Sequence, residues 1–467
     1  LSIATMTGTE LGLITVMYSA QKGFTGGFAA FHIAVIACIV TFFVGLTGFI
    51  VVPLRETGAM TIPEYYEMRF GRRTRILGAI LLAFGGILNM GLFLKIGSQF
   101  IIGATGIDPS GGLLVLVMVT LIVLVLVYTI LGGMVSVVIM DYIQFVVISI
   151  GLVVCVFLIL NKFGWEGMVD VVAQHKGESG FDPTIKGSGF GVPYMTWQGV
   201  LGLVSCAIWP TAVARALSAR NTRVVKTQYM FSSISFLIRF LIPYFLGVGA
   251  FAFIMTSGGI FQEAFFPSGG AEGIDDLYAM PIFLSHLLPT GLLGLVTASM
   301  IAAFMSTHDS YLLCWSSVIT LDIVAPLRKQ KPLSEKAKIL LTRLIMVCIG
   351  VYILIWGLFY EGSDDIWEYM GITGAIYSTG AISVLTFGLY WKRASSTGAI
   401  LALLAGFSAV LGLGGVREAL RYEVIEQVVG FHITAPIVGL LTLALSISVM
   451  VVGSLLWPDV REPEEAS

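Results

Sequence analysis

A group of polar residues interrupts a long apolar stretch in the second half of this sequence. Ser306, Thr307, Asp309 and Ser310 lie close together inside the mostly apolar segment 288–322. Hydroxyl and carbonyl oxygens are the ligands that a small hard cation such as sodium prefers. A Ser–Thr pair at membrane depth can instead bond to its own backbone or join two helices. Asp309 favours a functional role, because a mid-membrane aspartate is costly and marks a functional site by default.

A second polar group lies near the amino terminus, beside a predicted helix break. Thr7 and Glu10 stand at the glycine-containing stretch Gly8–Gly12, and Gly199 and Pro210 mark a similar break five segments later. Unwound backbone at membrane depth is tolerated where it lines a cavity, and its free carbonyls can coordinate a cation. Corresponding breaks in two halves of a chain are typical of inverted-repeat transporters. Glycine and proline also serve ordinary helix packing in membranes, so the breaks alone do not decide the function.

Two cations and a histidine lie inside other apolar segments. Lys95 is near the middle of the third segment, Arg239 lies four residues before Pro243, and His32 is in the second segment. A cation at such a depth requires a counter-charge or a wet cavity. Groups of this kind around one cavity favour an anionic ligand, since a guanidinium binds a carboxylate through two parallel hydrogen bonds.

These residues must be positioned by helices that cross a membrane. Of the 467 residues, 57% are hydrophobic and 12% are charged, whereas about a quarter of a soluble domain is charged. Runs such as Leu113–Ile130 and Phe145–Leu160 are apolar on nearly every face, unlike the alternating strands of a barrel. The sequence therefore predicts an all-α integral membrane protein. We expect twelve helices, with internal breaks in the first and sixth, at 1–20, 25–52, 76–106, 111–132, 135–161, 194–217, 228–256, 288–322, 338–360, 366–391, 397–416 and 434–457.

The charged loops predict how these helices are oriented, because Lys and Arg in short loops mark the cytoplasmic side. Basic loops follow the second, sixth, eighth and tenth helices, with Arg55, Arg69, Arg72, Arg73, Arg75, Arg215, Arg220, Arg223, Lys226, Arg328, Lys329, Lys331, Lys392 and Arg393. Acidic loops follow the seventh and ninth, with Glu263, Glu272, Asp275, Asp276, Glu361, Asp364, Asp365 and Glu368. We therefore expect a multi-pass protein of the plasma (inner) membrane, embedded in the lipid bilayer, with its basic loops in the cytoplasm.

Several other classes of protein find no support in the sequence. The net charge of −2 gives no argument for a nucleic-acid partner. The five cysteines fall inside apolar runs without ligand-like spacing, so we predict neither a disulfide nor a transition-metal site. No P-loop, nucleophile elbow or metal-binding motif occurs, and we predict that the chain is not an enzyme. The chain begins at Leu1 inside an apolar segment, and we expect that something preceded it.

Several different short motifs follow one another along almost the whole chain. They are Thr61-Ile62-Pro63-Glu64-Tyr65 with Arg69-Phe70-Gly71, Gly132-Gly133-Met134 before Asp141-Tyr142-Ile143-Gln144, Ala303-Phe304-Met305-Ser306-Thr307 with Asp309-Ser310, Thr320-Leu321-Asp322-Ile323, and Tyr390-Trp391-Lys392-Arg393. Each motif is weak alone, but their order and spacing together are specific. The chain resembles the sodium:solute symporter family, the relatives of the sodium/glucose, sodium/proline and sodium/sialic acid cotransporters.

The resemblance implies a fold and a domain organisation. The fold is the five-plus-five inverted repeat of the sodium/leucine transporter (LeuT-like), with discontinuous first and sixth helices, extra C-terminal helices and rocking-type alternating access. The transporter domain would cover 1–457, with repeat one at 1–161, repeat two at 194–391 and additional helices at 397–457. Residues 458–467 would form a cytoplasmic tail.

The resemblance also implies one or two Na⁺ sites. Matched residue by residue, the family's shared sodium site would use Ala4, Thr7, Ala303, Ser306 and Thr307. A second sodium site, present in some members, would use Asp141, Ser306, Asp309 and Ser310. Asp309 stands where some relatives carry a neutral residue, which leaves ion ligation, a structural pair and proton handling all open.

For the solute, the resemblance adds to the charge argument. Arg239 matches the position of a substrate-site lysine in a galactose-transporting member, Lys95 lies on a helix where a sialic acid transporter places a carboxylate-binding arginine, and His32 falls near another sugar ligand. With Glu10, these residues form the candidate substrate-binding set. Internal pairing of Lys95 or Arg239 with Glu10, Asp141 or Asp309 is the alternative.

The expected function is sodium-coupled symport of a small organic solute by alternating access. The charge argument favours a carboxylate-bearing anion such as a sugar acid, a monocarboxylate or an amino acid. A neutral sugar is the alternative solute. A solute sensor and a sodium-independent uniporter on the same fold are alternative functions.

Overall fold

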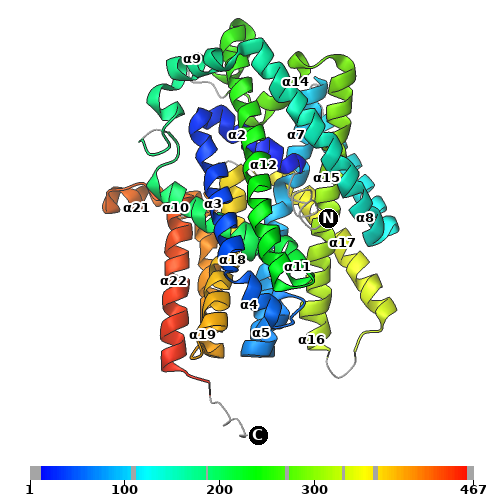
Figure 1. The fold of residues 1–467 in the computed structure, drawn as a ribbon, viewed down its shortest axis with the longest axis vertical. Coiled ribbons are helices and arrows are strands. Elements are labelled where there is room, and N and C mark those ends of the chain that lie inside the picture. Colours follow the sequence, from blue (N-terminus) through cyan, green and yellow to red (C-terminus); the bar gives the residue numbers. More distant parts are fainter. Residues whose placement is uncertain are drawn as a thin grey trace.

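The computed structural model is a bundle of helices, described for residues 12–106, 112–185, 188–268, 273–328, 332–360 and 366–459. The description leaves out the side chains of residues 131–145 and 429. These ranges contain helices and loops but no strand, and most of the long helices run along one axis (Figure 1). The prediction of an all-α protein is confirmed.

The described part of the first half contains eleven helical elements. They are α2 (Leu13–Gly26), η1 (Gly27–Ala30), α3 (Phe31–Thr47), α4 (Val51–Glu56), α5 (Ile62–Phe70), α6 (Arg72–Asn89), η2 (Met90–Leu92), α7 (Phe93–Thr105), α8 (Leu113–Phe163), α9 (Trp165–Lys176) and η3 (Gly177–Gly180). The helices of the second half are α10 (Val192–Ala207), α11 (Pro210–Leu217), α12 (Thr222–Ser257), α13 (Gly259–Phe265), η4 (Asp276–Tyr278), α14 (Ala279–Leu287), α15 (Thr290–Val318), the π turn η5 (Ile319–Val324), α16 (Ala325–Leu327), α17 (Glu335–Phe359), α18 (Ile366–Tyr390), α19 (Ser396–Phe407), η6 (Ser408–Gly412), α20 (Gly414–Ala419), α21 (Tyr422–Val429) and α22 (Ala435–Leu456).

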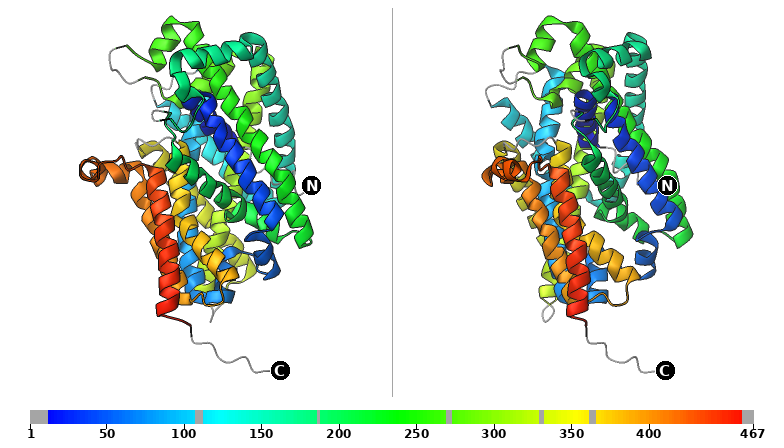
Figure 2. Two further views of the ribbon diagram at one scale, coloured as in Figure 1. Left: turned by 60° about the vertical axis from the view of Figure 1, so that its left-hand side comes forward. Right: turned by 90° about the vertical axis from the view of Figure 1, so that its left-hand side faces the viewer.

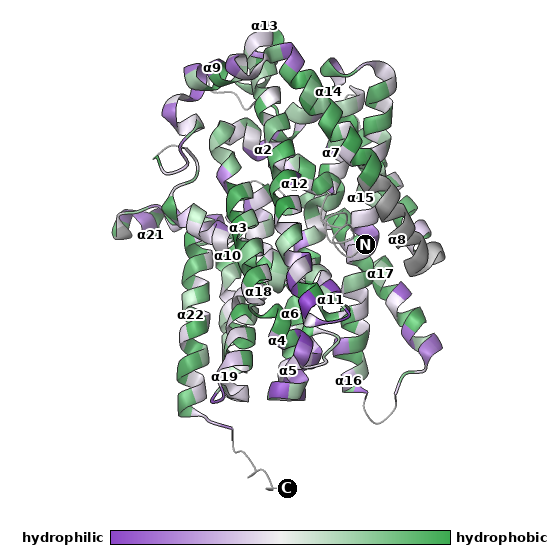
Figure 3. Cartoon of the chain, viewed as in Figure 1, coloured by the Kyte–Doolittle hydropathy of each residue, from purple (hydrophilic) through white to green (hydrophobic). Residues whose placement is uncertain are grey.

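Within the described ranges, nine helical stretches are long and apolar enough to cross a bilayer, and the bent pair α10–α11 makes a tenth. Two of the nine, Leu113–Ile130 and Val146–Phe163, belong to the one helix α8. The stretch Leu13–Thr47 covers most of the second predicted helix and most of the described part of the first. The predicted helix 397–416 corresponds to the shorter apolar helix Ser396–Gly412. Hydrophobic residues predominate in the middle of the bundle, and hydrophilic residues are more frequent toward its two ends (Figure 3).

Positive and negative loops lie at opposite ends of the bundle. Helices α4, α5, α11 and α16, which adjoin basic loops, lie at the lower end in Figure 1, whereas α13 and α14, which flank an acidic loop, lie at the upper end. This separation is what the alternating loop charges require. The assignment of the basic end to the cytoplasm remains a prediction.

The break predicted in the sixth helix is confirmed. Helices α10 and α11 meet at an angle of 45°, and the amides of Ile208 and Trp209 both donate to the carbonyl of Val204, at 3.1 and 2.8 Å. Pro210 then begins α11, a position where its missing N–H is not needed and its fixed φ suits the first turn. The other predicted break, at Gly8–Gly12, lies outside the described residues except for Gly12.

One predicted boundary is wrong. Helix α8 is a single 51-residue element, so the chain is not divided into 111–132 and 135–161 by a turn at Gly132 and Gly133. Glycine in a helix interior costs only about 1 kcal/mol relative to alanine. The segment contains neither a proline nor a charged residue before Asp141 that would enforce a turn.

Candidate functional site

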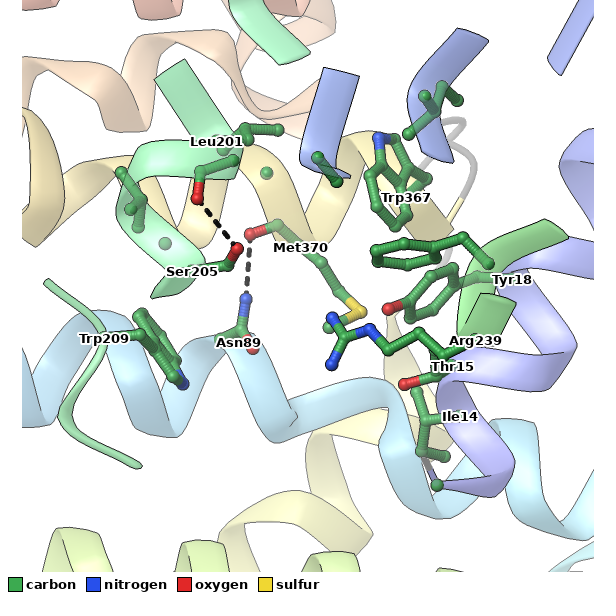
Figure 4. Close-up of a pocket in the computed structure, with 18 of the residues that line it drawn as sticks. Ile14, Thr15, Tyr18, Asn89, Leu201, Ser205, Trp209, Arg239, Trp367 and Met370 are labelled. Atoms are coloured by element: carbon green, nitrogen blue, oxygen red, sulfur yellow. Dashed lines mark hydrogen bonds between the residues drawn. The ribbon is translucent and has the colours of Figure 1, made fainter. Parts of the chain in front are cut away.

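A cavity of about 140 Å³ lies among the helices and takes its walls from distant parts of the chain. Its lining comes from α2, α3, α6, α7, α10, α12, α15 and α18, together with Trp209 at the start of α11. Figure 4 shows how these side chains converge. The α10–α11 break reaches the cavity at Trp209, and Gly12, the first described residue before α2, also lines it.

Arg239 contributes the charge of this cavity. It lies on α12, is 5% exposed, and is the one charged side chain among the described lining residues. Its guanidinium carbon lies 4.1 Å from the ring centre of Phe236 and 4.5 Å from that of Phe240. A guanidinium is weakly hydrated and stacks on aromatic faces, which makes this placement tolerable. Its head points toward Met370, in the middle of the residues drawn in Figure 4.

Two amide side chains add polar groups to the cavity. Asn89 on α6 donates to the carbonyl oxygen of Met370 at 2.8 Å and to the hydroxyl of Thr373 at 3.0 Å, which ties α6 to α18. Gln198 on α10 is 3% exposed, and its Nε2 has no hydrogen-bond partner among the described residues. A buried amide without a partner is costly, so Gln198 is suited to donate to a ligand. Arg239 and Gln198 together offer donors to an acceptor-rich solute.

Thr307 brings α15 to the same cavity. Its hydroxyl donates to the carbonyl oxygen of Ala303 at 3.0 Å, and the residue lines the cavity together with Gly12. A Cβ atom added to Gly12 would overlap the Thr307 hydroxyl and would lie 3.9 Å from the Ala303 oxygen. The start of α2 therefore lies against the Thr307 hydroxyl and close to the Ala303 carbonyl oxygen, two groups that the family resemblance predicts as sodium ligands. Ser306 is part-buried beside them, and Ala4 and Thr7 lie outside the described residues.

The residues predicted for a second sodium site are described only in part. Asp309 is 1% exposed on α15, and Ser310 next to it is part-buried. Helix α15 packs along α8, which carries Asp141. The side chain of Asp141 lies outside the description, so no geometry joins it to Asp309.

Of the four predicted substrate residues, the three that the structure describes do not share one cavity. Arg239 lines the cavity, whereas Lys95 donates to the carbonyl oxygen of Tyr360 at 3.4 Å and is not among the lining residues. Nδ1 of His32 lies 2.6 Å from the Ala29 carbonyl oxygen, and its ring packs against Phe190 at a centroid distance of 4.9 Å, also away from the lining. Glu10 lies outside the described residues.

Several lining residues were missed from sequence. Gln198 and Asn89 carried a usable signal, since uncharged amides are also uncommon inside membrane helices. Tyr18 and Trp367 carried none, because aromatic residues are frequent in such helices and their ring contact at 4.8 Å is set by the tertiary fold.

Toward the basic end, aromatic rings close the cavity and an ion-pair network lies beyond them. The indole of Trp209 donates to the Tyr311 hydroxyl at 3.2 Å, and Trp315 meets Trp209 edge to face at 5.6 Å. Asp322 in η5 is 2% exposed and bonds Arg75 at 2.7 Å. Arg75 also bonds Glu67 of α5 at 2.6 Å.

Comparison with known proteins agrees with this architecture. The family described as "Sodium:solute symporter family" matches residues 2–406. Sodium/glucose cotransporter 4 of Danio rerio is 26% identical over 415 residues, which is 80% of this chain and 59% of that protein. Human sodium/myo-inositol cotransporter 2 is 27% identical over 442 residues, which is 86% of this chain and 62% of that protein. The match thus spans about three fifths of the length of these relatives.

Two solved structures share the fold. A substrate-bound, outward-open sodium-coupled sialic acid symporter matches with a TM-score of 0.75 and 19% identity, covering 98% of this chain and 90% of that one. A nucleobase-cation-symport-1 transporter in a closed conformation matches with a TM-score of 0.57 and 13% identity, covering 98% and 91%. The expectation of a LeuT-like transporter fold is confirmed.

Proposed function

Because this chain belongs to the sodium:solute symporter family, we propose that it couples inward movement of Na⁺ to uptake of a small organic solute across the plasma membrane. The solute would occupy the cavity beside Arg239, and sodium would lie where the start of α2 meets α15. The basic loops would face the cytoplasm. Each sodium ion entering the cell releases about 2.3 kcal/mol per 100 mV of membrane potential, which can drive accumulation of a solute.

The solute that we propose is a carboxylate-bearing anion, such as a sugar acid, a monocarboxylate or an amino acid. The observation that carries this proposal is the buried guanidinium of Arg239 at a cavity whose described lining contains no aspartate or glutamate. In such surroundings a guanidinium binds a planar carboxylate through two short hydrogen bonds. Gln198 and the rings of Tyr18, Phe240 and Trp367 would complete the binding surface.

For sodium, we propose that Ala303, Ser306 and Thr307 act with Ala4 and Thr7. The contact of Gly12 with Thr307 supports this proposal, because it brings the chain that leads to Ala4 and Thr7 up to α15. A second ion at Asp141, Ser306, Asp309 and Ser310 is part of the same proposal. Sodium that joins the two segments would preorganise the cavity, since Thr307 contributes to both, and each ligand would then favour binding of the other.

The experiment that tests the function is a thermal-shift screen of the purified protein. Carboxylates, neutral sugars and amino acids are each added in sodium and in choline buffer. We expect a carboxylate to raise the unfolding midpoint in sodium only. Arg239→Met should then weaken its binding by at least about ten- to a hundredfold, the range of a single charge-assisted hydrogen bond.

Lys95→Met is the matched control, since it removes a part-buried cation that does not line the cavity. It should leave solute affinity within about twofold of the original. A sodium-dependent shift by neutral sugars alone would replace the carboxylate with a sugar. A solute shift of equal size in both buffers would contradict sodium coupling and favour a uniporter or a sensor.

A further inference from the structure

One short helix projects from the bundle. Helix α21 lies at the end of α22 from which the chain enters that helix, and it extends sideways, across the direction of α22 (Figure 1). Both views in Figure 2 place it at the same end. The proposed transport function uses no residue of this arm.

The two faces of α21 differ sharply in polarity. Five apolar side chains of α21 and the residues that flank it are 41% to 85% exposed: Leu420, Val424, Ile425, Val428 and Phe431. At 100° per residue, Val424, Ile425 and Val428 share one face of the helix. Glu423, Glu426 and Gln427 occupy the opposite face. The pattern is that of an amphipathic helix whose apolar side is not covered by the bundle.

The connection to α22 holds this helix in place. The Glu426 carboxylate accepts a hydrogen bond from the amide of Ile433 at 2.8 Å and pairs with His432 at 2.7 Å. These bonds lower the pKa of Glu426, with the His432 hydrogen bond as the larger cause. These bonds across the turn between α21 and α22 fix the direction of α21 relative to α22.

Helix α22 fixes the level of α21 relative to a bilayer. Its 22 residues span about 33 Å at 1.5 Å per residue, close to the hydrocarbon thickness of about 30 Å. Leu441, Leu445, Val452 and Leu455 form one exposed apolar stripe along it. Trp457, 54% exposed, marks the end away from α21, where tryptophan suits the interface. The opposite end, where α21 lies, is therefore about one bilayer thickness away along α22, and α9 and α14 extend further in the same direction (Figure 1).

We infer that α21 is an interfacial anchor whose apolar face lies in the headgroup and upper acyl region of the outer leaflet. Its uncovered apolar face, its direction across α22 and its level at one end of a bilayer-length helix together match this class of element. The anchor sets the depth of α22, and through it of α18 and α19, which pack against α22. The anchor itself needs only a membrane-spanning chain, whereas its assignment to the outer leaflet rests on the proposed cytoplasmic orientation of the basic loops.

A second copy of this chain is a less suitable occupant for this face. Helix α21 has eight residues and is therefore about 12 Å long. A stable protein interface buries about 1,200–2,000 Å² in total, more than so short a helix can supply. A lipid surface requires no such area, and the apolar stripe of α22 continues toward α21.

The test compares two neighbouring positions on opposite faces of α21. In a background without the five native cysteines, Val428→Cys and Gln427→Cys are each labelled with an environment-sensitive fluorophore and reconstituted in phosphatidylcholine vesicles. We expect doxyl-lipid quenching to be at least threefold stronger at 428 than at 427. Iodide, which stays in water, should quench 427 more strongly than 428.

Equal quenching of both positions by iodide would overturn the inference, because α21 would then lie in water. If position 428 is protected from iodide only at a high protein-to-lipid ratio, and loses this protection when the ratio is lowered tenfold, the inference is also overturned, in favour of a second copy. Protection that persists at every protein-to-lipid ratio supports the anchor. Both sites are exposed, and the unfolding midpoint of each labelled variant shows that the fold is retained.

Discussion

At the residue scale, the observed hydrogen bond of the Thr307 hydroxyl bears on its proposed role as a sodium ligand. Its hydrogen is directed to the Ala303 carbonyl, which is the packing bond expected of a threonine in a membrane helix. A hydroxyl oxygen keeps its acceptor lone pairs when it donates, and these can face a cation. Backbone bonding and sodium ligation are therefore compatible in one side chain, and the first does not argue against the second.

Thr307→Ala should weaken sodium binding by about tenfold, since it removes one oxygen ligand worth about 1.4 kcal/mol. Thr307→Ser keeps the hydroxyl and should restore most of the affinity. The measurement is the sodium concentration that half-saturates solute binding. Ser299→Ala is the matched control, because Ser299 on the same helix makes the same type of bond, to Leu295 at 2.7 Å, but does not line the cavity. Equal effects of Thr307→Ala and Ser299→Ala would remove Thr307 from the site.

Single residues differ in how well the sequence predicts their role. Arg239 was found because a cation at membrane depth is costly and must be accommodated by the fold. Lys95 gave the same signal, yet its flexible stem reaches the Tyr360 carbonyl instead of the cavity. Composition and spacing cannot separate these two cases, because the direction of a side chain depends on the neighbouring helices. Gln198 was missed although an uncharged amide inside a membrane helix was a usable signal; it lines the cavity, and its Nε2 has no partner among the described residues.

At the element scale, a glycine contact between α2 and α12 holds two walls of the cavity together. A Cβ atom added to Gly247 would overlap the carbonyl of Ala20, and one added to Gly23 would overlap the carbonyl of Tyr244. The two backbones therefore approach each other through reciprocal glycines. This approach places Thr15 and Tyr18 of α2 beside Arg239 of α12 at the cavity.

Gly247→Ala should lower stability by about 1–3 kcal/mol, the usual cost of overpacking, because the obstacle is backbone and cannot move aside. Gly294→Ala in α15 is the control, since a Cβ atom there meets nothing within 4 Å. It should be neutral or stabilising by up to about 1 kcal/mol. The readout is the midpoint of thermal unfolding. A Gly247→Ala midpoint equal to that of Gly294→Ala would contradict close contact of the two helices.

Elements with a local cause were predictable, and those with a tertiary cause were not. The α10–α11 break follows from Pro210, whose ring and missing N–H act on the chain itself. The turn expected in α8 rested on two glycines, which weaken a helix without ending it. The glycine contact between α2 and α12 joins residues 224 positions apart, Gly23 and Gly247. A single sequence contains no signal for such a pairing.

At the scale of the whole molecule, one side of α15 connects the proposed ion site to the basic end. Thr307, Tyr311 and Trp315 follow at intervals of four residues, and the π turn η5 then presents Asp322 to Arg75. Tyr311 and Trp315 contact Trp209 beneath the cavity. Access from the basic end must therefore separate α15 and η5 from α6 and α11. The Arg75–Asp322 pair opposes that separation.

Asp322→Asn should shift the protein toward the state open at the basic end. It leaves Arg75 bonded to Glu67 but removes the charge that joins α6 to η5. A charge-assisted bond is worth about 1.5–3 kcal/mol, so the open-to-closed ratio should rise roughly tenfold or more. The measurement uses Leu201→Cys, a position in the cavity lining, in a protein without the native cysteines. A membrane-impermeant thiol reagent is applied from each side of vesicles that hold the protein in one orientation, and the two labelling rates are compared.

Glu67→Gln separates this gating role from simple loss of stability. Glu67 bonds the same arginine but is 37% exposed and belongs to α5, on the same side of the gap as Arg75. It should change the labelling ratio less than Asp322→Asn does. If Asp322→Asn lowers the unfolding midpoint yet leaves the ratio of labelling from the two sides unchanged, the pair is only structural. If labelling from the basic end alone becomes faster, the Arg75–Asp322 pair holds that end of the cavity closed.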